Sequence, residues 1–131
     1  MKKVAIIGAG ISGLFIANLF KKNPKFQVTI FEKNTSVISD EGYGVQLSVN
    51  SIKILNEIGF QKLETSEKFT PEKISFYSNE NSNKICELDI SDFNSEDCKY
   101  TTLKRSTLIN FLKKDLEGSI KTGYNISKIN Q

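Results

Sequence analysis

The chain has 131 residues and a formal net charge of +3, with 38% hydrophobic and 25% charged residues. This composition supplies enough apolar side chains for one packed domain and argues against intrinsic disorder. The chain has two cysteines and no histidine, which excludes zinc fingers and His-based catalytic triads and leads us to expect no metal site. The positive excess is small and scattered, so it does not predict nucleic-acid binding.

The two cysteines, Cys86 and Cys98, are not spaced as a redox pair, and no basic cluster surrounds both. We interpret Cys86 as a half-buried strand residue and Cys98 as a loop residue of a protein that is not a disulfide-stapled secreted domain. Lysine is the default cation of this sequence, and Arg105 is its single arginine. Arg105 is therefore a candidate functional residue.

An apolar segment runs from Val4 to Phe20 and follows two lysines. It is shorter than the roughly 20 apolar residues of a comfortable membrane span, and glycines interrupt it. No small-residue cleavage site follows it, so a signal peptide is not indicated either. The sequence has no other long apolar run, and we therefore expect no membrane span and a cytoplasmic location.

The first third of the chain predicts a strand, a helix and a second strand. Lys3 to Ile7 is a short β-branched run ended by glycine, which is typical of a fully buried parallel strand. Gly10 to Lys22 has helical spacing, and the Asn23-Pro24 pair that follows stops a helix. Phe26 to Glu32 has the composition of a strand. Together these segments predict a right-handed βαβ unit.

The remainder of the chain predicts shorter elements. Lys33 to Ser48 is a glycine-bearing loop, and Ser91 to Asp97 is an acidic loop. Helices with an apolar stripe are expected over Asn50–Ile58, where Gly59 ends the helix, and over Ser106–Leu116. Strands are expected over Ile74–Tyr77, Lys84–Leu88, Tyr100–Leu103, Ser119–Lys121 and Asn125–Ile129. The first two of these strands flank a polar run at 78–83 and predict a β-hairpin.

Gly8, Gly10 and Gly13 form a G-x-G-x-x-G motif between the first predicted strand and the first predicted helix. This is the context that a dinucleotide-binding loop requires. Gly8 suits a tight turn, Gly10 lets a pyrophosphate approach the backbone, and Gly13 lets the helix pack close to the strand. Because a helix N-terminus also supplies free N–H groups and partial positive charge, the motif predicts binding of a dinucleotide.

Glu32 lies at the end of the second predicted strand, 19 residues after Gly13. A carboxylate at this place accepts hydrogen bonds from a ribose hydroxyl and repels a 2′-phosphate, which disfavours NADP at this site. The motif and its acidic partner do not distinguish NAD from FAD.

Two later segments resemble a known family. Residues 42–50, GYGVQLSVN, and the predicted helix after them resemble the segment that follows the second strand in FAD-dependent aromatic-ring hydroxylases, most closely the salicylate-hydroxylase-like flavoprotein monooxygenases. Residues 103–112, LKRSTLINFL, resemble a later helix start of the same enzymes. The resemblance implies an α/β fold, an incomplete Rossmann-like FAD/NAD(P)-binding βαβ fold. It also implies that the antiparallel hairpin, within about residues 70–100, belongs to the substrate-side sheet.

The resemblance further implies roles for individual residues. Glu32 would hold the adenosine ribose with Lys33 beside it, and the backbone at Gly44 and Val45 would pass near the flavin. Arg105 would reach the phosphate or ribityl region, which suits the planar, permanently charged guanidinium. The residues that would cradle the FAD diphosphate are Gly8, Gly10, Ile11, Ser12 and Gly13.

By resemblance, the complete protein hydroxylates an aromatic or similar small molecule with FAD, NADH or NADPH, and O2, and no catalytic residue is identified. The family's second FAD fingerprint, a Gly-Asp-Ala block, is absent. Residues 1–131 are therefore expected to be the N-terminal third of an FAD-binding enzyme, inactive and colourless alone. Two other interpretations stay open. One is an NAD-dependent dehydrogenase domain, against which the hairpin counts because it interrupts a βαβ series. The other is a non-catalytic nucleotide-binding remnant.

Overall fold

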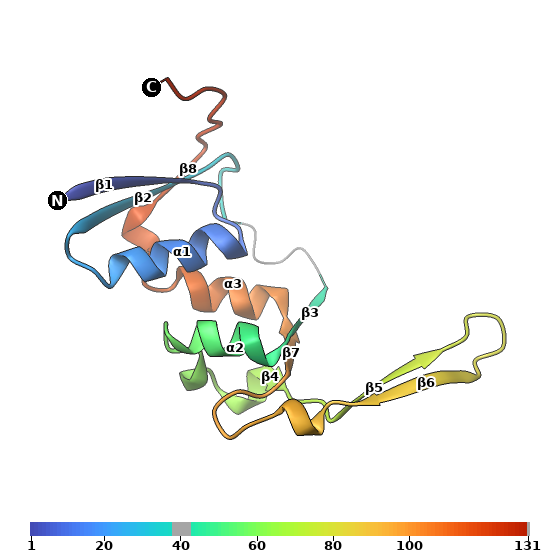
Figure 1. The fold of residues 1–131 in the computed structure, drawn as a ribbon. Helices are drawn as coiled ribbons and strands as arrows, with labels where there is room; N and C mark the ends of the chain where they lie inside the picture. The colour runs from blue at the N-terminus through green and yellow to red at the C-terminus, as the bar shows by residue number, and fades with distance from the viewer. Residues whose placement is uncertain (38–42, 131) are drawn as a thin grey trace. The chain divides into compact units, whose positions relative to one another are not determined.

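The computed structural model describes residues 1–37 and 43–130, and the chain divides into two compact units (Figure 1). The first unit comprises Met1–Tyr43 and Arg105–Gln131, and the second comprises Gly44–Lys104. The second unit is therefore inserted into the sequence of the first. Within the described ranges, no helix has the length and apolar character needed to cross a membrane.

A parallel three-stranded sheet forms the centre of the first unit (Figure 1). Its strands lie in the order β1-β2-β8, with Val4 opposite Val28 and Ile30 opposite Ile120. The elements in chain order are β1 (Lys2–Ile7), α1 (Ile11–Lys21), β2 (Phe26–Glu32), α3 (Arg105–Lys113), the 3₁₀ helix η4 (Glu117–Ser119) and β8 (Ile120–Thr122). The predicted βαβ unit is confirmed, and α3 is a second crossover helix, so the fold is Rossmann-like.

Helix α1 packs against strand β2, and helix α3 packs against α1 (Figure 1). Both crossovers advance across the sheet in the same direction, and right-handed crossovers that do so place their helices on one face. Asn18 Nδ2 of α1 donates a hydrogen bond to the backbone carbonyl of Leu112 in α3 at 2.7 Å. The fully buried aliphatic side chains of this unit are Leu14, Ala17, Ile30, Leu108, Ile109, Leu112 and Leu116.

The prediction that the first strand is fully buried is wrong for β1. Its burial alternates, and the side chain of Ile7 is 55% exposed. Ile6 lies on the helix side, since its Cγ2 is 3.3 Å from the place that a Cβ on Gly13 would take. A parallel strand is buried on both sides only where helices cover both faces of the sheet. In the described part of the first unit, helices cover one face.

The second unit contains two antiparallel sheets and helix α2 (Val49–Asn56). One sheet has the order β3-β7-β4, and the other is the β5-β6 hairpin. The strands are β3 (Gly44–Leu47), β4 (Lys68–Phe69), β5 (Lys73–Tyr77), β6 (Lys84–Asp89) and β7 (Thr101–Lys104), and the 3₁₀ helices are η1 (Phe60–Lys62), η2 (Thr65–Glu67) and η3 (Ser91–Phe93). Gly59, the predicted helix stop, follows α2 with a φ of 91°, a left-handed conformation that favours glycine.

The predicted loop from Lys33 to Ser48 contains strand β3, which is a correction. Gly44–Leu47 pairs antiparallel with Thr101–Lys104. So short a segment carries little pattern of its own, and its distant partner decides that it is a strand. The two-residue strand β4 was not predicted for the same reason. Residues 38–42 of the predicted loop lie outside the described residues.

The strand predicted over Asn125–Ile129 is wrong. Residues 125–130 have no regular structure, and the side chain of Ile129 is 70% exposed. A strand needs a neighbour to receive its backbone hydrogen bonds, and among the described residues no strand pairs with this segment. Helix α3 also ends earlier than predicted, although Leu116 beyond it is fully buried.

Strands β5 and β6 form the predicted hairpin, and in the described ranges they pair with each other and with no other strand. On one face Ile74 lies opposite Leu88, and Phe76 lies opposite Cys86. Cys86 is exposed rather than half-buried as expected, because a two-stranded hairpin has no neighbouring strand to shield its side chains.

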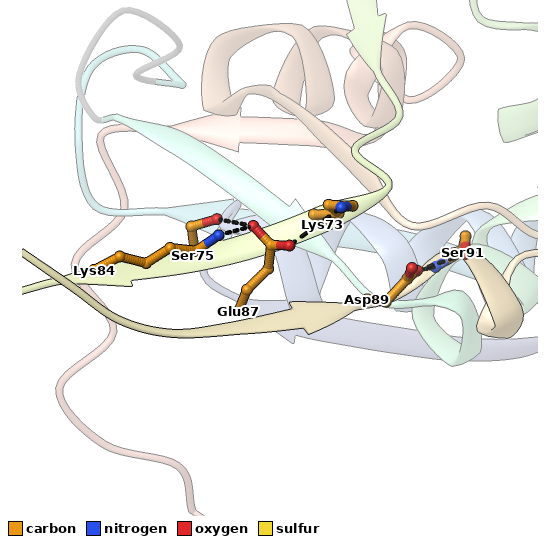
Figure 2. A network of polar contacts seen from close by, with 6 residues as sticks. All are labelled: Lys73, Ser75, Lys84, Glu87, Asp89 and Ser91. Carbon is orange, nitrogen blue, oxygen red and sulfur yellow. Dashed lines mark hydrogen bonds and ion pairs between the residues drawn. The ribbon is translucent and has the colours of Figure 1, made fainter.

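The other face of the hairpin carries a polar network centred on Glu87 (Figure 2). The Glu87 carboxylate accepts hydrogen bonds from Ser75 Oγ at 2.9 Å and from Lys73 Nζ at 3.1 Å, and it also pairs with Lys84. The hydrogen bonds from Lys84, Lys73 and Ser75 lower the pKa of Glu87 to about 2. This exposed carboxylate is therefore ionised over the whole neutral range.

Candidate functional site

The three glycines of the motif differ in whether the fold itself requires glycine at their position. Gly8 has a φ of +97°, which side chains rarely adopt. A Cβ on Gly13 would lie 2.1 Å from the carbonyl oxygen of Gly8, so only glycine lets α1 pack this closely on the end of β1. Gly10 has an ordinary φ of −76°, and a Cβ there would meet none of the described residues within 4 Å. The fold thus requires Gly8 and Gly13, whereas Gly10 borders open space.

The N-terminus of helix α1 borders this open space and has no side-chain cap. Gly10 is the N-cap and provides no side-chain cap, and the first turn contains no acidic residue. The first hydrogen bond of the helix runs from Leu14 N–H to the Gly10 carbonyl at 2.9 Å. The N–H groups of Ile11, Ser12 and Gly13 precede it and have no carbonyl one turn earlier. This end of α1 therefore has the donors and the partial positive charge that bind an anion.

Glu32, the last residue of β2, forms a hydrogen bond with the backbone of the glycine turn. Its Oε2 accepts a hydrogen bond from the buried Ala9 N–H at 2.8 Å, and its Oε1 accepts one from Asn34 N–H at 3.0 Å. The side chain is 9% exposed. Sequence reasoning expected this carboxylate to await a ribose. Instead, each oxygen already has one backbone donor, and each keeps a further acceptor position.

The hydrogen bond from Asn34 is the largest influence on the Glu32 carboxyl, and it lowers the pKa below the usual range. Burial opposes this effect, while the Ala9 N–H and the charge of Lys33 add to it. Hydrogen bonds to the charged form of a carboxyl outweigh its partial desolvation here. Glu32 is therefore an anion at neutral pH, ready to accept further donors.

The segment that follows β8 forms hydrogen bonds with the backbone of Glu32 and Asn34. Tyr124 N–H donates to the Glu32 carbonyl and Gly123 N–H donates to the Asn34 carbonyl, each at 2.8 Å. The Tyr124 ring packs edge-on against Phe31, with centroids 5.6 Å apart. Sequence reasoning missed Ala9, Asn34 and Tyr124. The signal available in the sequence was the glycine at position 123, and the structure gives this residue a φ of +77°, a left-handed conformation that favours glycine.

The structure brings most of the predicted site residues into one unit. The exposed Lys33 follows Glu32, Ser12 is exposed in the first turn of α1, and Ile11 is half-buried beside it. Arg105 is the first residue of α3 and belongs to this unit, and its N–H donates to the Tyr43 carbonyl at 3.2 Å.

Gly44 and Val45 belong to the second unit. They pair with Lys104 and Leu103 of β7. A Cβ on Gly44 would lie 3.6 Å from the Leu103 carbonyl oxygen, an ordinary contact, so packing in this unit does not require glycine there. The glycine turn and Glu32 therefore form one site within the first unit, and the approach of Gly44 and Val45 to it stays a prediction.

The arrangement has the chemistry of a phosphate cradle with a sugar anchor. Open space above Gly10 adjoins the donors of the α1 N-terminus, and a buried carboxylate lies at the end of the neighbouring strand. Phosphates suit the first feature, and a vicinal diol suits the second.

Comparison with known proteins agrees with this description. Residues 6–47 match the family model described as an NAD(P)-binding Rossmann-like domain. Over 58 residues, 44% of the chain, the sequence is 38% identical to the FAD-dependent monooxygenase anuJ of Penicillium roqueforti. Over the same length it is 40% identical to the 3-amino-4-hydroxybenzoate 2-monooxygenase PtnB3 of Streptomyces platensis. These matches span 7% and 14% of the two relatives.

Among solved structures, an HpxO variant of Klebsiella pneumoniae complexed with FAD has the same fold. The TM-score is 0.80 at 14% identity, and the match covers 98% of this chain and 32% of that one. The chain thus spans about a third of this structural neighbour. In sequence, the chain is similar to a part of two monooxygenases, one of them described as FAD-dependent, and in fold it is similar to a part of this FAD-complexed protein.

Proposed function

We propose that this chain is the FAD-binding part of a flavin-dependent monooxygenase. The observation that carries the proposal is Gly10, which neither its backbone conformation nor its packing requires to be glycine, at the open N-terminus of α1. A pyrophosphate approaching the backbone is the reason for glycine at such a place. The similarity to FAD-dependent monooxygenases favours FAD over NAD as the dinucleotide.

Within this proposal, each site residue has a task. Gly8, Gly10 and Gly13, with the N–H groups of Ile11 and Ser12, hold the diphosphate. The Glu32 carboxylate accepts from the adenosine ribose through its free acceptor positions, and Lys33 adds positive charge beside it. Arg105 is proposed to bind phosphate or ribityl oxygens, and Gly44 and Val45 to pass their backbone near the ring.

The activity of the whole protein follows from the cofactor. When bound, FAD supplies the redox chemistry by which NADH or NADPH and O2 hydroxylate a small aromatic or similar molecule. The chain's own contribution is to bind and orient the cofactor. We propose that about residues 70–100 join the substrate-side sheet. The two cysteines are free thiols, as is usual in a reducing compartment, and this supports a cytoplasmic location.

An NAD-dependent dehydrogenase is the second candidate. The family model that matches residues 6–47 favours it, since that model is described as NAD(P)-binding. The second unit counts against it, because Gly44–Lys104 interrupts the crossover from β2 to β8 with antiparallel strands. A regular doubly wound domain would continue with further βαβ units.

The test is Gly10→Val in the full-length protein, with Gly118→Val as the matched control. At both positions a Cβ meets no atom of the part of the chain that the structure describes within 4 Å, so both variants are expected to fold. Gly10→Val is expected to lose bound flavin because the new side chain occupies the space of the pyrophosphate, whereas the control keeps it. Flavin absorbance after purification and titration with FAD measure this. Full flavin stoichiometry in Gly10→Val would overturn the assignment.

Arg105 is tested by Arg105→Lys, with Lys114→Arg as a control that exchanges the same two cations elsewhere. An ammonium group cannot reproduce the two parallel hydrogen bonds of the guanidinium fork, so FAD affinity is expected to fall by about tenfold. Equal FAD dissociation constants in the variant and the parent would remove Arg105 from the site.

A further inference from the structure

We propose that Glu32 is a positioning residue, which holds the glycine turn in its phosphate-binding conformation through the Ala9 N–H before any nucleotide binds. This inference rests on the proposed function for the identity of the ligand. It concerns a different contact from the ribose, namely the two hydrogen bonds that the carboxylate already makes within the chain.

The turn needs such a restraint. Ala9 lies between Gly8, with its φ of +97°, and Gly10, whose Cβ side is in contact with no residue in the described ranges. Glycine loses more conformational freedom on folding than any other residue. The Ala9 residue is 4% exposed, so its N–H must find a partner inside the protein. Glu32 Oε2 is that partner at 2.8 Å, across 23 residues of sequence.

The second oxygen of Glu32 makes the restraint rigid. Oε1 accepts the Asn34 N–H at 3.0 Å, so the carboxylate joins the turn after β1 to the turn after β2. Both partners are donors, and both carboxylate oxygens are needed as acceptors. A glutamine side chain of the same shape has one oxygen and one NH₂ group. In Glu32→Gln, one of the two backbone donors would therefore face another donor.

If Glu32 positions the turn, Glu32→Gln changes the affinity for a phosphate ligand in the opposite direction from that expected if only the charge of Glu32 matters. The negative charge of Glu32 lies beside the N-terminus of α1, where it reduces the attraction of an incoming anion. If only charge mattered, Glu32→Gln would bind a phosphate ligand more tightly. If Glu32 positions the turn, the variant binds it more weakly, even when the ligand has no ribose.

The experiment uses inorganic pyrophosphate with the flavin-free full-length protein, its Glu32→Gln variant and a Glu117→Gln control. Glu117 is an exposed carboxylate of the same unit, so the control removes the same charge without touching the turn. We expect amide hydrogen exchange to accelerate by about tenfold in Glu32→Gln alone, at Ala9 or at Asn34 according to which of the two faces the new NH₂ group, since tenfold corresponds to one ordinary hydrogen bond. We also expect pyrophosphate binding to weaken severalfold in the same variant.

Unchanged exchange at both Ala9 and Asn34, or tighter pyrophosphate binding in Glu32→Gln, would overturn the proposal. If the variant does not fold, the parent protein decides the question. As the carboxyl group titrates in acid, with Lys33 as its charged neighbour, the amide proton shift of Ala9 should follow the same curve. An Ala9 shift that does not titrate overturns the proposal. A parent that binds neither pyrophosphate nor FAD contradicts the proposed function instead, and the Ala9 measurements still decide the role of Glu32.

Discussion

The β1–α1–β2 segment and the β5–β6 hairpin each surround a carboxylate with donors, but the donors differ in kind. Glu32 is buried and accepts from the backbone N–H groups of Ala9 and Asn34. Glu87 accepts from two lysines and a serine on the surface (Figure 2). Backbone donors are ordered by the fold itself, whereas exposed lysines lose rotamer entropy when they pair and are screened by salt. The fold therefore fixes the glycine turn far more firmly than the hairpin network.

The two units also differ in charge. The first unit has eleven basic and five acidic residues, a net charge of +6, whereas the second has seven basic and ten acidic residues, a net charge of −3. A positive surface raises the local concentration of an anionic ligand and speeds its approach. The excess of positive charge and the phosphate-binding turn thus lie in the same unit.

The largest effect is expected where backbone meets backbone. In Gly13→Ala the new Cβ would lie 2.1 Å from the Gly8 carbonyl oxygen, and α1 must move away from β1. We expect the free energy of unfolding of the full-length protein to fall by about 3 kcal/mol, as for severe overpacking. Urea denaturation measures this, with Gly118→Ala as the control. Equal loss in both variants would contradict the close contact of α1 with β1.

A moderate effect is expected for Asn18→Ala, which removes a side chain that binds backbone. Asn18 Nδ2 donates to the carbonyls of Leu14 and Leu112, at 2.9 and 2.7 Å, and so joins α1 to α3. We expect a loss of about 1–2 kcal/mol in the free energy of unfolding, because these carbonyls lose a partner. Asn110→Ala, an exposed position of α3, is the control. Equal stability of the two variants would show that backbone-directed side chains do not hold this unit.

The contributions of Glu32 and Glu87 are expected to respond differently to salt. At neutral pH, 1 M NaCl is expected to accelerate amide exchange in β5 and β6 and to leave Ala9 unchanged, because screening acts on exposed ion pairs. Both carboxyls have a pKa lowered by folding, so their contributions are complete above the ordinary value of 4.5 and disappear as the pH falls. For Glu87 this loss extends down to about pH 2. Equal salt sensitivity of Ala9 and the hairpin would remove the distinction.

The smallest effect is expected for Glu87→Gln. The variant keeps an acceptor for Ser75 and loses the charge that pairs with Lys73 and Lys84. We expect no change in the midpoint of thermal unfolding and faster amide exchange confined to β5 and β6, with Glu80→Gln in the hairpin turn as the control. A lowered midpoint would mean that the exposed network stabilises the whole second unit.

Several parts of the fold and site could be predicted from the sequence because they depend on neighbours in the chain. The run from β1 to β2, the glycine turn and the stop at Gly59 follow from residue spacing and from backbone conformations that favour glycine. The hairpin follows from two strand-like segments around a polar turn.

Tertiary structure alone decided the features that depend on distant partners. Gly44–Leu47 is a strand because β7 lies beside it, whereas residues 125–130 are not, because in the described ranges no strand pairs with them. Ile7 is exposed because helices cover one face of the sheet in the described part of its unit. Glu32 was identified from its spacing, but its two partners, Ala9 and Asn34, were not. Local pattern reports what a residue prefers, whereas strand pairing, burial and the direction of a hydrogen bond depend on which distant segments the fold brings together.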